Sequence, residues 1–148
     1  MPTDPLPAAI ERGLRAEVLA LKRRGARGHL PLQLGAGQPG AVDDGAARFE
    51  AGLGRDWDQH TRTEVAVALG NRLGCGPGDP PGGEVPAPML WVSRSGDLEL
   101  SPNDLSWLSA GRAAWAELGW APSFALVTRT GWLHQPSDRM RVWRRLRG

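Results

Sequence analysis

The chain of 148 residues contains a single cysteine, Cys75, and a single lysine, Lys22. One cysteine excludes an internal disulfide and any zinc site built from several cysteines. The sequence also lacks a run of about 18 apolar residues, the length that a membrane-spanning helix needs. No apolar segment follows a basic one near residue 1, as it would in a secretory signal. From these absences we expect a cytoplasmic protein that does not enter a membrane.

Sequence motifs for common cofactors and for nucleophilic catalysis are missing as well. No Gly-rich segment stands between a strand and a helix with a lysine after it, so neither a phosphate-binding loop nor a dinucleotide fingerprint is indicated. Ser93, Ser95 and Cys75 have no base beside them in the sequence, and His60 or His134 would have to approach them in space. We therefore predict no cofactor and favour a protein that is not an enzyme.

Tryptophan is frequent by contrast, with seven residues, six of them at or after Trp91. Tryptophan buries more apolar surface than any other side chain, so this distribution predicts a folded core in the C-terminal half. Apolar residues make up 41% of the chain and charged residues 23%. Both values are typical of globular proteins and argue against extensive disorder.

Glycine and proline divide the chain into parts. They dominate residues 75–88, which we interpret as a linker between a helical N-terminal part (1–74) and a Trp-rich part (89–148). We expect the two parts to form one compact domain. In the N-terminal part the pattern predicts three helices and one strand: a helix over Pro5–Arg24, a short edge strand around Leu30–Leu34, a short helix ending at Gly54 after an Asp43 or Asp44 cap, and a helix over Trp57–Leu73.

The Trp-rich part has the pattern of a strand, a helix and a strand. Met89–Val92 and Phe124–Val127 are apolar throughout, as expected for strands covered on both faces. Between them, Ser101 is suited to cap a helix that ends at Gly119, with its buried face formed by Leu105, Leu108, Trp115 and Leu118. This order favours a parallel pair of strands joined by a right-handed crossover. We therefore predict an α+β or small α/β fold, with a mixed sheet covered by this helix on one face and by the N-terminal helices on the other.

The last ten residues fit two structures. Arg139 and Arg141 alternate with Met140 and Val142, which favours a returning strand after a turn at residues 135–138. Alternatively, Ser137 caps a final helix. The alternation favours the strand.

A metal site has one candidate pattern in the N-terminal part. Asp56, His60 and Glu64 recur every four residues and would lie along one face of a helix. The first and last of them are about 12 Å apart along a rigid helix, too far for one ion to contact both. Helix capping and solvent-facing charges explain the pattern better, so we predict no metal at these residues.

Two functions from different classes remain. Residues 139–148 contain five arginines and no acid, interrupted by Trp143, whereas the rest of the chain is nearly balanced in charge. Guanidinium groups bridge phosphate oxygens and an exposed tryptophan stacks on bases. The leading hypothesis is thus a non-enzymatic nucleic-acid-associated or adaptor module that binds through an Arg/Trp-rich C-terminal surface. Its predicted residues are Arg139, Arg141, Trp143, Arg144, Arg145 and Arg147.

An acidic protein is the other candidate partner for this basic surface, because a cluster of arginines attracts acidic side chains as well as phosphates. Trp143 would then belong to the core. The alternative function is a metal-dependent hydrolase or nuclease that uses Glu64, Asp97 and Glu99 as paired carboxylates. Asp97 is, however, a natural turn residue. Convergence of these three acids in space would favour the enzyme.

Overall fold

The computed structural model describes residues 6–24, 30–41, 45–52, 57–73 and 88–144. Within them the chain forms three helices and six strands. In order these are α1 (Ala8–Arg24), β1 (Leu32–Gly37), β2 (Ala46–Gly52), α2 (Gln59–Asn71), β3 (Met89–Ser93), α3 (Pro102–Leu118), β4 (Phe124–Val127), β5 (Gly131–Gln135) and β6 (Met140–Val142).

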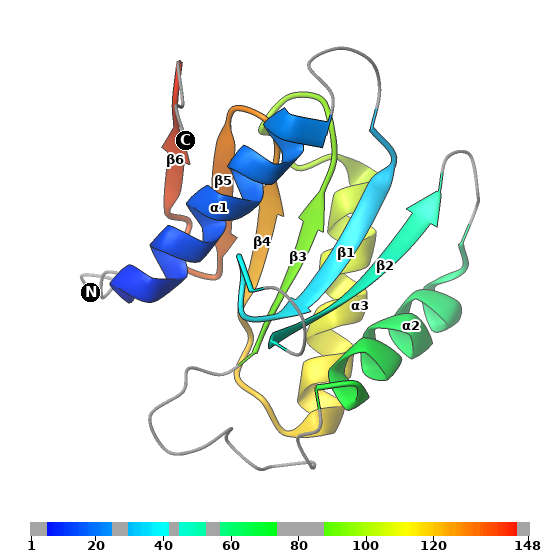
Figure 1. Ribbon diagram of the computed structural model, residues 1–148. Coiled ribbons are helices and arrows are strands. Elements are labelled where there is room, and N and C mark those ends of the chain that lie inside the picture. Colours follow the sequence, from blue (N-terminus) through cyan, green and yellow to red (C-terminus); the bar gives the residue numbers. More distant parts are fainter. Residues whose placement is uncertain (1–5, 25–29, 42–44, 53–56, 74–87, 145–148) are drawn as a thin grey trace.

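All six strands belong to one mixed sheet with the order β2-β1-β3-β4-β5-β6. β3 and β4 run parallel, and every other neighbouring pair runs antiparallel. A parallel pair needs a crossover connection, and α3 supplies it behind the sheet in Figure 1. The predicted α+β class and the strand–helix–strand unit are therefore confirmed. Because β1 pairs with β3, the sheet also unites the segments before and after the predicted linker.

Both ends of α3 are formed as the sequence predicts. The Ser101 hydroxyl accepts the N–H of Asp104 at 3.1 Å, and the Asp104 carboxylate accepts the N–H of Ser101 at 2.9 Å. This reciprocal capping box satisfies two of the backbone donors that a helix start leaves unpaired. At the other end Gly119 adopts a left-handed conformation with φ of 79°, which glycine tolerates without strain.

One face of the sheet is covered by α2 and α3 and holds most of the aromatic side chains. Trp107 and Trp115 are completely buried there. The rings of Trp115 and Trp120 meet edge to face with centroids 5.1 Å apart, and those of Trp57 and Trp107 do so at 5.8 Å. Such contacts add to the free energy gained from burying the rings. We call this side of the sheet the α3 face.

On the opposite side, the α1 face, α1 is the only described helix and crosses the sheet diagonally (Figure 1). An apolar stripe at helical spacing packs α1 onto the sheet and consists of Ile10, Leu14, Val18 and Leu21. Its partners on the strands are Met89, Trp91, Ala125, Val127 and Trp132. The two cores lie on opposite sides because successive side chains of a strand point to opposite faces.

Residues 46–52 form a strand, β2, where the sequence pattern predicts a short helix. Alanine, arginine and glutamate favour helices in isolation, which explains the error. Pairing with β1 overrides this preference, and the alternation of the segment fits a strand: Phe49 packs on the α3 face while Arg48 lies on the α1 face. The part of the chain before residue 74 is therefore not wholly helical.

Three smaller expectations are also corrected. β1 lies between β2 and β3 and is an interior strand, not the predicted edge strand. Pro31 is compatible with this position because the strand begins at Leu32, so the proline interrupts no ladder hydrogen bond. α2 packs beside α3, so of the two N-terminal helices in the described ranges α1 alone lies on the opposite face. Leu105, expected to be buried, is 51% exposed.

The C-terminal segment takes the strand form that the alternation favours. Met140–Val142 pairs with β5 as β6, at the edge of the sheet. Between β5 and β6 the chain turns at Pro136 and Ser137, with a cis peptide bond before Pro136. Among the described helices, none is long and apolar enough to cross a membrane.

Candidate nucleic-acid interface

A basic groove lies between the N-terminal half of α1 and the β5–β6 end of the sheet. Its volume is about 240 Å³. The residues that line it are Ala8, Glu11, Arg12, Arg15, Trp132, Arg141 and Trp143. Three arginines face one glutamate, so the groove carries excess positive charge. This combination of aromatic rings and guanidinium groups is the one that the sequence pattern indicated for the C-terminal end.

Strand alternation places the predicted residues of β6 on the groove side. Arg141 lies opposite Trp132 in the β5–β6 pair, and Trp132 belongs to the α1-face core. Residues 139, 141 and 143 therefore share this face, whereas Met140 and Val142 point away and are each 54% exposed. The guanidinium carbon of Arg141 lies 5.3 Å from the ring centroid of Trp143, within the range of a cation–π contact.

Trp143 is held at the border between the core and the groove. Its backbone N–H donates to the carbonyl of Thr130 at 2.8 Å, which fixes the chain directly after β6. Its side chain is half-buried and packs against the α1-face core. One part of the ring thus stabilises the fold while another part lines the groove. Both expectations for this residue, core and surface, hold in part.

The wall opposite β6 comes from α1. Arg12 and Arg15 are exposed and lie three residues apart, so they project from neighbouring turns of one helix face. The sequence pattern gave no reason to join them to the C-terminal arginines, because the contact depends on how α1 crosses the sheet. The remaining predicted arginines do not line the groove: Arg139 is partly buried, Arg144 is exposed, and Arg145 and Arg147 lie outside the described residues.

The three residues of the alternative enzyme hypothesis lie on different parts of the fold. Asp97 and Glu99 lie on the loop after β3, where their backbone carbonyls accept hydrogen bonds from Arg94 at 3.2 and 2.8 Å. Glu64 lies on α2 and contacts His60 at 3.0 Å, with both side chains exposed. Asp56 is outside the described residues. Within the part of the chain that the structure describes, no three His, Cys, Asp or Glu side chains could hold a metal ion. The geometry gives the metal-dependent enzyme no support.

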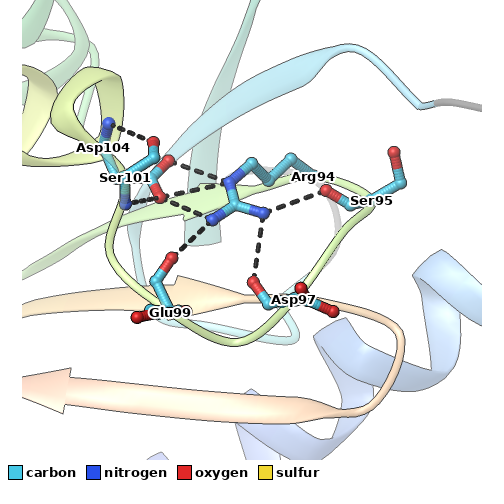
Figure 2. Close-up of polar contacts among 6 residues, drawn as sticks. All are labelled: Arg94, Ser95, Asp97, Glu99, Ser101 and Asp104. Atoms are coloured by element: carbon cyan, nitrogen blue, oxygen red, sulfur yellow. Dashed lines mark hydrogen bonds and ion pairs between the residues drawn. The ribbon is translucent and has the colours of Figure 1, made fainter.

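Arg94 instead organises this loop as a structural clasp (Figure 2). Its Nε and Nη2 donate to the two carboxylate oxygens of Asp104 at 2.9 and 2.6 Å, and Asp104 is completely buried. These hydrogen bonds raise the pKa of the Arg94 guanidinium, which stays charged. The remaining N–H groups reach backbone carbonyls, including that of Ser95 at 3.0 Å. The clasp ties the start of α3 to the end of β3.

A buried histidine between two serines was not foreseen. The Nε2 of His134 lies 3.2 Å from the Ser123 hydroxyl, and its Nδ1 lies 2.6 Å from that of Ser137. Burial lowers the pKa of His134, so the ring is neutral near pH 7. The contact depends on the pairing of β4 with β5, which brings His134 opposite Ala125. Only a prediction of that pairing would have indicated it from the sequence. Neither Ser123 nor His134 lines the groove.

Comparison with known proteins returns no match: no family model, no curated protein and no solved structure resembles the chain.

Proposed function

We propose that the protein is a non-enzymatic nucleic-acid-associated module that binds single strands through the groove between α1 and β6. The observation that carries the proposal is the meeting of Arg12, Arg15, Arg141 and Trp143, from two ends of the chain, around one hollow. Arginine supplies forked donors for phosphate oxygens, and an accessible tryptophan face stacks on a base.

Single strands fit this groove better than a duplex. A base must be unstacked before it can lie on a tryptophan ring, and single-stranded nucleic acid offers such bases without a cost in pairing. The cation–π contact with Arg141 holds the Trp143 ring in place before a ligand arrives. We expect little dependence on base sequence, because every base has a face that can stack.

Fluorescence anisotropy with labelled DNA and RNA oligonucleotides, single- and double-stranded, tests the proposal at about 20 mM salt and above. The affinity for single strands should fall steeply with salt. Arg12→Gln and Arg141→Gln should each lower it and reduce the slope of log K against log salt by about 0.7, the value for one phosphate contact on a single strand. Arg112→Gln is the matched control, since Arg112 is exposed on α3 and lies outside the groove.

Trp143→Ala separates stacking from charge. It should weaken single-strand binding by about 1–3 kcal/mol while leaving the salt slope unchanged, because the ring contacts a base and not a phosphate. Absence of binding to every oligonucleotide at low salt contradicts the proposal. If poly-glutamate binds in that case and Arg141→Gln weakens it, the groove recognises an acidic protein segment instead.

A further inference from the structure

A second polar pocket lies on the α1 face, under the C-terminal half of α1 and over the β1–β2 end of the sheet. Its volume is about 230 Å³. Four polar side chains that approach from four different elements are Arg24 of α1, Gln33 of β1, Arg48 of β2 and Ser93 of β3. The basic groove of the proposed function lies at the other half of α1, so this pocket is a separate site.

The floor of the pocket is fixed by strand pairing. Gln33 and Ser93 are direct partners in the β1–β3 ladder and share the α1 face. Ser93 is 94% buried, and no hydrogen-bond partner for its hydroxyl exists in the described part of the chain. The hydroxyl oxygen is not one of the buried side-chain atoms that lack a partner, so it faces the open space of the pocket, where a polar ligand can reach it.

The guanidinium group of Arg48, which lines one side of the pocket, is held in place before any ligand binds. Its Nη1 and Nη2 each donate at 2.9 Å to the Glu17 carboxylate, which is 95% buried and also accepts the N–H of Gly40 at 2.8 Å. The hydrogen bonds with Glu17 raise the pKa of Arg48, so the guanidinium stays charged. Its carbon lies 5.6 Å from the ring centroid of Trp91. The Trp91 ring packs closely against β1 at Gly35, where a Cβ atom would lie only 2.1 Å from it.

The charge and donors of the pocket define the ligand. Arg24 and Arg48 contribute two positive charges and Glu17 one negative charge, which leaves one positive charge to be matched. The Nη1 of Arg24 donates to the side-chain amide oxygen, Oε1, of Gln33 at 2.6 Å, so the side-chain N–H₂ of Gln33 is the donor that remains. The unoccupied groups are therefore donors that suit an oxygen-bearing monoanion. A phosphate dianion would leave a negative charge beside Glu17.

The volume of the pocket and its apolar lining narrow the class of ligand further. Ala20 and Leu21 of α1 complete the lining. A volume of about 230 Å³ lies below the roughly 300–1,000 Å³ of drug-sized sites. We propose that this pocket binds a small monocarboxylate, with the carboxylate on Arg24, Arg48, Gln33 and Ser93 and a short apolar body against Ala20 and Leu21.

The test is a titration of the ¹⁵N-labelled full chain with sodium acetate, butyrate and phosphate at constant ionic strength, followed by NMR. Butyrate should produce saturable shifts at Gln33 and Ser93, with higher affinity than acetate because its chain contacts the apolar wall. Arg24→Gln should weaken butyrate about tenfold, the effect of losing one charge-assisted hydrogen bond. Arg23→Gln is the matched control, because Arg23 is the exposed neighbour on the same helix and does not line the pocket.

The Ser93→Ala variant separates an effect on butyrate binding from an effect on folding. Since the hydroxyl has no partner in the described structure, its removal should leave the unfolding midpoint unchanged while it weakens butyrate several-fold. The proposal would be overturned if butyrate produced chemical-shift changes of the same size in the Arg23→Gln and Arg24→Gln variants and these changes did not saturate. Saturable binding of phosphate without binding of either carboxylate would overturn the ligand class.

Discussion

The two faces of the sheet differ in how completely they are covered. The α3 face lies under two helices that bury Trp107, Trp115 and Leu69 in one apolar cluster. In the described part of the chain the α1 face has one helix, which crosses the sheet with a polar hollow on either side of its path. Both described hollows with several arginines thus belong to the face with less cover. Aromatic packing is thus concentrated on one face, and the described hollows lined by several arginines lie on the other.

The same residue types serve different purposes on the two faces. On the α3 face Trp115 is sealed, and its Nε1 donates to the Pro88 carbonyl at 2.8 Å. On the α1 face Trp91 and Trp143 each lie within 6 Å of an arginine, Arg48 and Arg141. On the α3 face the guanidinium carbon of Arg62 likewise lies 5.8 Å from the ring centroid of Trp107. Both faces therefore contain arginine–tryptophan contacts, but among the described residues only those of the α1 face, through Arg48 and Arg141, line a hollow.

Truncation of Trp115 should cause the largest loss. Trp115→Ala removes a fully buried ring and its contacts with Trp120 and Phe124, so we expect a decrease of about 3–5 kcal/mol in the free energy of unfolding. Trp143→Ala, on the α1 face, should cost clearly less because that ring is half-buried. Urea denaturation of both variants gives the comparison. Equal losses would show that the two faces do not differ in this way.

Breaking the clasp at the start of α3 should have the next largest effect. Asp104→Asn removes the carboxylate that pairs with the largely buried guanidinium of Arg94. We expect the free energy of unfolding to decrease by about 3 kcal/mol. Asp97→Asn is the matched control, since Arg94 uses the backbone carbonyl of Asp97. Denaturation curves should show a shifted midpoint only for Asp104→Asn. A similar shift in both variants would mean that the carboxylate of Asp97 also holds the loop.

The segments predicted correctly from sequence are those whose signals are local. β3 and β4 are continuous apolar runs, and α3 has a capping residue, a proline at its first turn and a glycine after its last. These features determine structure within a few residues of where they stand. The prediction for residues 46–52 was wrong because these residues favour a helix, and only their pairing with β1 makes them a strand. β5 was missed for a related reason: its pattern is short, and its partners β4 and β6 complete it.

The candidate sites divide in the same way. The basic side of β6, with Arg141 and Trp143, follows from alternation in the sequence alone. Arg12 and Arg15 could not be joined to it, because residues at opposite ends of the chain meet only through the path of α1 across the sheet. The pocket lined by Arg24, Gln33, Arg48 and Ser93 is harder still to predict, since its lining comes from four elements and Ser93 gives no signal until its burial is known.

Adding one methyl group on each face provides a finer comparison. The Cβ of Gly35→Ala would lie 2.1 Å from the rigid Trp91 ring, and we expect a loss of about 1–3 kcal/mol from overpacking. The Cβ of Gly111→Ala on α3 would lie 2.2 Å from a terminal methyl of Leu90, which can rotate away, and alanine favours a helix by about 1 kcal/mol. Gly111→Ala should therefore be closer to neutral.

Thermal or urea unfolding of both glycine variants checks this order. Gly35→Ala should also weaken butyrate binding, because a displaced Trp91 ring no longer supports Arg48. An unchanged midpoint for Gly35→Ala would mean that the Trp91 ring does not rest over β1. A greater loss for Gly111→Ala would place the tighter packing on the α3 face.

The smallest effect we expect is a pH dependence from His134 on the α1 face. Burial lowers its pKa in the folded protein, whereas the unfolded chain titrates near the ordinary value of about 6.5. Between these two pKa values the unfolded state binds more protons, so stability is complete above pH about 6.5 and decreases as the pH falls toward the folded pKa. The loss is limited because the hydroxyls of Ser123 and Ser137 can accept hydrogen bonds from both nitrogens of the charged ring. Urea denaturation at pH 7 and pH 5 should show a decrease for the natural chain and a smaller one for His134→Gln. An identical decrease in both would mean that His134 is equally solvated in the folded and unfolded states.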